Sequence, residues 1–211
     1  VNGALQGGAL EVAARCAMAA SDSFKLHGPY ADGIALLNRI RTEAISESSL
    51  ARVHRKMGLL LQHLAGKQSE TTHYFERALE GFRALGERQN SAVTMMNLAA
   101  FIVRKGQFEQ AQAYYDEALA VFQEMNVRQV EGVCLGNIAT LYRRLGRHHD
   151  ALEVMNKALA ISREIGDRSS ECVQLTNLSN VYKEEGQVDR GKACADAAIS
   201  IARELDNRYF E

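Results

Sequence analysis

The sequence contains few residues that interrupt helices, and its charges nearly cancel. Its 211 residues include no tryptophan and a single proline, Pro29. Because proline ends or kinks a helix, one proline leaves long stretches free to be helical. Lys and Arg number 25 and Asp and Glu number 26, so the formal net charge is -1. This balance gives no reason to expect a nucleic acid or a membrane surface as partner.

Cysteines are also few, and long apolar runs are missing. The four cysteines lie far apart without C-x-x-C spacing, which argues against a zinc site or a disulfide framework, and no cofactor is expected. Buried free thiols in a reducing cytoplasm are the expectation. No apolar run approaches the roughly 20 residues that span a bilayer, and the start, VNGALQGGAL, lacks the basic region of a signal peptide. We therefore expect a cytoplasmic protein, and the initial Val1 suggests a processed product or a fragment.

A forty-residue repeat organises most of the chain. Segments that start at Asn97, Asn137 and Asn177 align without a gap, and one more step back reaches Met57. Glycine, alanine and arginine keep this spacing in three columns: Gly66, Gly106, Gly146, Gly186; Ala78, Ala118, Ala158, Ala198; and Arg88, Arg128, Arg168, Arg208. Three columns in agreement make a chance alignment very improbable.

These columns predict one solenoid over residues 1–211. We expect repeats at 47–86, 87–126, 127–166 and 167–206, and a degenerate copy at 9–46 in which the glycine step is thirty-eight residues. Residues 1–8 are expected to be flexible. Residues 207–211 would begin a truncated or capping helix, because the repeat is still in phase there.

Each repeat has the apolar spacing of two antiparallel helices. Ala151, Met155 and Ala158 recur at three and four residues, as on one face of a helix. Gly146 stands where a helix end favours a left-handed residue, and Gly166-Asp167 ends one helix and caps the next. No segment alternates with period two. The fold class expected is all-α.

The multi-position pattern resembles the tetratricopeptide repeat. The fourth unit carries it as Ile138, Ala139, Tyr142, Gly146, His148, Ala151, Met155 and Ala158. The usual proline after the second helix is absent, and the period is forty rather than thirty-four residues. The longer period is similar to that of kinesin light chains, Leu-Gly-Asn-repeat scaffolds and bacterial sensor modules. The resemblance implies a right-handed superhelix of antiparallel helix pairs, whose first helices line a concave groove that receives a segment of a partner protein.

Asparagine marks the candidate groove. Asn97, Asn137 and Asn177 each precede the apolar pair of a first helix, and an amide side chain can pair with a peptide backbone. Similar asparagine ladders occur in the family that the pattern resembles. Asn180 lies one helical turn beyond Asn177, and Thr140 occupies the equivalent place one repeat earlier. The alternative is that these asparagines only hold adjacent helices together.

A basic group at the far end of the first helices is a second candidate feature. It consists of Arg104, Arg143, Arg144, Lys183 and His63. A partly basic groove would favour an acidic partner segment and speed its capture. The alternative is a solvated surface without a binding role.

The arginines that follow each break are expected to be structural. Arg128 with Glu131, Arg168 with Glu171 and Arg208 with Glu211 have helical i,i+3 spacing. We expect them to be exposed ion pairs, which contribute little to stability.

Three functions follow from this pattern. The first is a scaffold or sensor that binds a peptide or a partner segment. The second is self-association, because an uncapped C-terminal end would expose an apolar face that includes Val181, Ala195 and Ile199. The third is the regulatory part of an enzyme. No catalytic motif is present, so the segment itself is not expected to be an enzyme.

Overall fold

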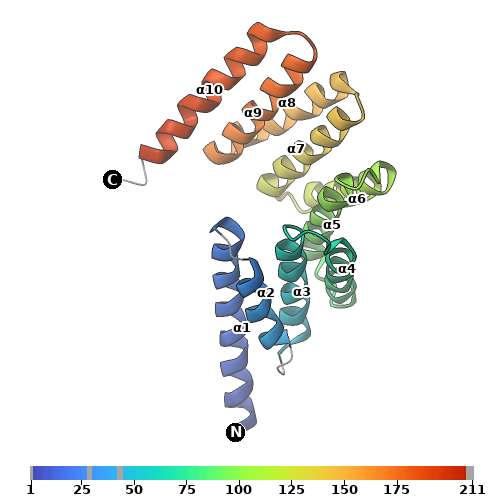
Figure 1. The fold of residues 1–211 in the computed structure, drawn as a ribbon, viewed down its shortest axis with the longest axis vertical. Helices are drawn as coiled ribbons and strands as arrows, with labels where there is room; N and C mark the ends of the chain where they lie inside the picture. Colours follow the sequence, from blue (N-terminus) through green and yellow to red (C-terminus); the bar gives the residue numbers. More distant parts are fainter. Residues whose placement is uncertain (1, 28–29, 42–44, 208–211) are drawn as a thin grey trace. The chain divides into compact units, whose positions relative to one another are not determined.

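The computed structural model describes residues 2–27, 30–41 and 45–207, which form helices and no strand (Figure 1). The helices are α1 (Asn2–His27), α2 (Tyr30–Arg41), α3 (Glu47–Leu61), α4 (Gln68–Ala84), α5 (Arg88–Val103), α6 (Phe108–Glu124), α7 (Arg128–Arg144), α8 (His148–Glu164), α9 (Arg168–Glu184) and α10 (Val188–Asn207). The all-α prediction is confirmed.

The chain divides into two compact units, Val1–Phe101 and Ile102–Glu211, with the boundary inside α5. In the first unit, α1 packs on α2 and α3 packs on α4. In the second unit, α7 packs on α8, α9 packs on α10, and both α8 and α7 contact α9. A single solenoid over all 211 residues therefore stays a prediction, and the two units are described separately.

Residues in the left-handed region separate the helices. The glycines at the breaks have φ between 67° and 77°, a conformation that costs a residue with a side chain more than it costs glycine: Gly66, Gly86, Gly106, Gly146, Gly166 and Gly186. Asn126 takes the place of glycine at one break, with φ of 53°. After Gly166, the Asp167 carboxylate accepts the backbone N–H of Ser170, which confirms the predicted cap. Asp206 stands forty residues after Gly166, in the glycine column. Helix α10 does not break there and continues to Asn207.

Small residues lie where helices approach most closely. Ala78, Ala118 and Ala158 are fully buried, and Ala198 is nearly so. A larger side chain at such a contact would overpack it at a cost of about 1–3 kcal/mol. The repeated alanines therefore set the distance within each helix pair.

Two expectations about exposure are wrong. Val181 is fully buried, as is Leu141 one repeat earlier, because this position faces the inside of its own repeat. Ile199 of the same predicted face is 49% exposed, as expected. Among the cysteines, Cys134 is buried but Cys16 is exposed, so the thiols do not share one environment.

Candidate binding groove between helices α7 and α9

Two of the predicted asparagines line one pocket in the second unit. The pocket has a volume of about 220 Å³ and lies between the first helices α7 and α9. Asn137 and Asn177, one from each helix, are both half-buried at its surface. The remaining lining residues are Val133, Gly136, Ser169, Ser170, Val173 and Gln174. None of these residues is charged, and Val173 is 55% exposed. The pocket therefore combines amides with an accessible apolar surface.

Gln174 packs against Gly136 in this pocket. A Cβ atom built on Gly136 would lie 2.6 Å from Gln174 Nε2 and 2.8 Å from its Oε1. Glycine thus leaves the space that the Gln174 amide occupies. The side chain is 3% exposed, and its buried Oε1 has no hydrogen-bond partner. An unpaired buried acceptor costs on the order of 1–3 kcal/mol, so this amide is held at an energetic cost.

Residues equivalent to Gln174 in other repeats do have partners. Cys134, forty residues earlier, donates from Sγ to the carbonyl oxygen of Tyr115 at 3.8 Å. Burial raises the pKa of the Cys134 thiol to about 12, so the donor proton is retained at neutral pH. Thr94, in the first unit, donates its hydroxyl to the carbonyl oxygen of Asn90 at 2.7 Å. Gln174 differs from both in its unpaired acceptor and in lining a pocket.

The structure does not bring all the predicted polar residues to this pocket. Asn180 and Lys183 line a separate pocket of about 260 Å³, which α9 forms with α10. Thr140 is half-buried, and its hydroxyl donates to the carbonyl oxygen of Gly136 at 3.0 Å. Asn97 is half-buried on α5 in the first unit.

The predicted basic residues also lie in different surroundings. Arg143 donates to Glu184 at 2.7 Å, so an acidic side chain of α9 balances its charge. Arg144 and Arg104 are exposed in the second unit. His63, in the first unit, stacks on Tyr30 with ring centroids 4.7 Å apart. The pairing of Arg143 weakens the argument for a basic groove.

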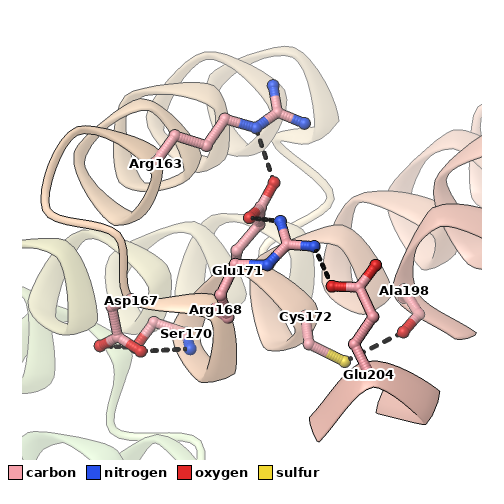
Figure 2. Close-up of polar contacts among 8 residues, drawn as sticks. All are labelled: Arg163, Asp167, Arg168, Ser170, Glu171, Cys172, Ala198 and Glu204. Carbon is pink, nitrogen blue, oxygen red and sulfur yellow. Dashed lines mark hydrogen bonds and ion pairs between the residues drawn. The ribbon is translucent and has the colours of Figure 1, made fainter. Parts of the chain in front are cut away.

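Glu171 lies at the centre of a polar cluster in the second unit (Figure 2). It accepts from Arg163 Nε of α8 at 2.8 Å and from Arg168 Nη1 of its own helix at 2.5 Å. Arg168 also donates to Glu204 of α10 at 2.6 Å. Burial acts to raise the pKa of Glu171, but the hydrogen bonds from the two arginines outweigh it and lower the pKa below its ordinary value. The cluster joins three consecutive helices.

A related cluster surrounds Glu131, forty residues earlier. Arg128 pairs with Glu131 at 2.8 Å and with Glu164 of α8 at 2.5 Å. Gln123, at the position equivalent to Arg163, donates a hydrogen bond to Glu131. The expectation of exposed pairs is wrong for these two glutamates, because each is only 6% exposed. Spacing along one helix could not show the partners that neighbouring helices supply. Arg208 and Glu211 lie outside the described residues.

The described residues offer little for other kinds of site. They contain no group of three or more His, Cys, Asp or Glu side chains that could hold a metal ion. Within the same residues, no helix combines the length and apolar character needed to cross a membrane. A cleft of about 490 Å³ lies over α6, α7 and α8, and its lining includes charged side chains such as Asp116 and Lys157.

Family models match two parts of the chain, at residues 90–164 and 175–205, and both are described as tetratricopeptide repeat. None of the curated proteins compared with the chain matches it.

Among solved structures, the chain is similar to BtubC (BKLC) from P. vanneervenii, with 23% identity over 88% of this chain and 78% of that one, at a TM-score of 0.72. The putative kinesin light chain repeats of Podosopora anserina show 15% identity over 90% and 95% of the two chains, at a TM-score of 0.68. The Rap conjugation gene regulator of plasmid pLS20, in complex with the Phr* peptide, shows 16% identity at a TM-score of 0.77. That match covers 90% of this chain and 53% of the regulator. These likenesses confirm the fold.

Proposed function

The chain is a tetratricopeptide repeat protein, and on that premise we propose that it binds an extended segment of another protein in the groove between α7 and α9. The observation that carries the proposal is that Asn137 and Asn177 line one pocket. Each amide offers both a donor and an acceptor, as an extended peptide backbone requires. The Rap regulator, which shares this fold, is known in complex with a peptide.

The lining of the pocket supports a peptide over a charged small molecule. Backbone amides are uncharged, and so are all the side chains of the pocket. Exposed Val173 offers apolar contact beside the two asparagines. Each hydrogen bond contributes about 0.5–1.5 kcal/mol net, so the asparagines supply register and part of the affinity, and side-chain contacts supply the rest.

Selection from a random peptide library tests this function. Peptides enriched on the wild-type protein are measured against the Asn137→Ala/Asn177→Ala double variant. We expect binding to weaken by about tenfold or more, since two hydrogen bonds are lost. Asn156→Ala is the matched control, because Asn156 is exposed on α8 and donates only to the carbonyl oxygen of Leu152 in its own helix. Equal binding by the double variant, or enrichment of no peptide, contradicts the proposal. The same selection tests the predicted preference for acidic segments.

Self-association is a second candidate, and a different observation favours it. The pocket that α9 forms with α10 includes Ile199, which is 49% exposed, and Ser179, whose buried hydroxyl has no hydrogen-bond partner. A second copy of the chain could cover this face. Light scattering over a range of concentrations decides: a dimer that Ile199→Asp dissociates supports this function, and a concentration-independent monomer rules it out.

A further inference from the structure

We infer that Gln174 selects one residue of the bound segment, and that the pocket beside the Gln174 amide takes a side chain that ends in a carboxamide, asparagine or glutamine. This inference rests on the proposed peptide-binding function. It assigns a specificity-determining role to a residue outside the asparagine column. The two observations behind it are the unpaired buried acceptor of Gln174 and the open space beside it.

The geometry leaves Gln174 ready to pair with a ligand. The side chain is 97% buried, yet it lines the pocket of about 220 Å³ that Asn137 and Asn177 also line. The Gln174 amide itself fills the space directly above Gly136, and the pocket continues beside it. A segment that crosses the groove along the two asparagines can therefore insert one side chain beside the Gln174 amide.

A carboxamide satisfies this site better than other side chains do. Two carboxamides pair through reciprocal N–H to oxygen hydrogen bonds, and this pairing works for either orientation of the Gln174 amide. An apolar side chain would leave Oε1 of Gln174 unpaired. A charged side chain would lose hydration in a pocket whose lining contains no opposite charge.

A purely structural role for Gln174 leads to a different expectation. If the side chain only separates α7 from α9, then methionine, of similar length and flexibility, would preserve both packing and binding preference. If Gln174 reads a carboxamide, Gln174→Met removes the unpaired acceptor and the recognition together. The variant would then unfold at the same or a higher temperature than the wild type while its peptide preference changes.

The experiment profiles one position of the bound peptide. A wild-type binder from the random library is resynthesised with each residue in turn replaced, and the set is measured on wild type, Gln174→Met and Gln110→Met. Gln110 is exposed on α6 and controls for the chemical change. We expect one position at which the wild type and Gln110→Met prefer asparagine or glutamine over leucine by about tenfold. Gln174→Met should lose this preference at that position alone.

The outcomes distinguish a failure of this inference from a failure of the proposed peptide binding. Peptides whose binding needs Asn137 and Asn177, but whose preferences are unchanged in Gln174→Met, overturn the inference and leave peptide binding intact. A selected position that prefers an apolar or a charged residue in the wild type also overturns it. Failure of every library peptide to bind the wild type overturns both.

Discussion

Glu171 of α9 accepts a hydrogen bond from Arg163 of α8 at 2.8 Å, which links the forty-residue repeats 127–166 and 167–206 through a nearly buried carboxylate. Arg168 donates to the other carboxylate oxygen of Glu171. Because Glu171 is nearly buried, water screens its charge-assisted hydrogen bonds less than those of an exposed pair, and the cluster should matter more for stability than a surface pair does.

Glu171→Ala should therefore destabilise the protein by about 1–2 kcal/mol, since two charge-assisted hydrogen bonds are lost while the two arginines can return to water. Urea unfolding at pH 7 measures the change. Glu153→Ala is the control, because the pair of Glu153 with Lys157 at 2.7 Å is exposed on both sides and should leave the urea midpoint unchanged. Equal midpoints for both variants would show that the cluster contributes no more than a surface pair.

His54 should make stability depend on pH. Burial, assisted by the nearby charges of Arg77, Arg41 and His73, lowers the pKa of His54 to about 4. In the unfolded chain this pKa returns to about 6.5, so the unfolded state binds the proton more readily. The contribution of His54 to the free energy of unfolding is fully present above about pH 6.5 and is lost as the pH falls toward 4.

The loss of stability between pH 7 and pH 5 should accordingly be smaller in His54→Leu than in the wild type. Urea midpoints at several pH values check this, with His149→Leu as the control, because the side chain of His149 is 95% exposed. Parallel pH curves for wild type and His54→Leu would contradict the assignment.

Gly58→Ala should destabilise the first unit. An added Cβ would lie 2.9 Å from the ring of Phe75, which is fully buried. Overpacking of this kind costs about 1–3 kcal/mol, more than alanine gains over glycine in a helix. Thermal unfolding provides the measurement.

Gly8→Ala provides the matched comparison, because a Cβ there meets no atom within 4 Å. It should raise stability by about 0.5–1 kcal/mol through the better helix propensity of alanine. If both alanine variants are stabilised alike, Phe75 yields more easily than the packing indicates.

The sequence predicts the fold well because the breaks are local signals. Glycine at Gly146 or Gly166 can be recognised by its position after an apolar helical stretch, and the structure shows both in the left-handed region. Asp167 is a cap for equally local reasons. By contrast, the burial of Glu131 and Glu171 depends on partners from other helices, which spacing along one helix does not show.

The site was only partly predictable for a similar reason. The forty-residue column led to Asn137 and Asn177, which the structure places at one pocket. It did not lead to Gln174, although His54, Thr94 and Cys134 share its column and all are buried. All four members of this column differ in chemistry, so the column gives no pattern that singles out Gln174, and the role of Gln174 depends on the glycine that faces it, Gly136.

The central claim, that a peptide lies along the asparagines of the groove, is tested most directly by NMR of the side-chain amide groups. Signals are assigned by their loss in the single alanine variants, and a library-selected peptide is then added to the wild type. The account predicts that the side-chain amide signals of Asn137 and Asn177 shift in step with binding while that of Asn156 stays in place. Shifts confined to residues of α6 and α8 around the cleft of about 490 Å³, with Asn137 and Asn177 unchanged, would contradict it.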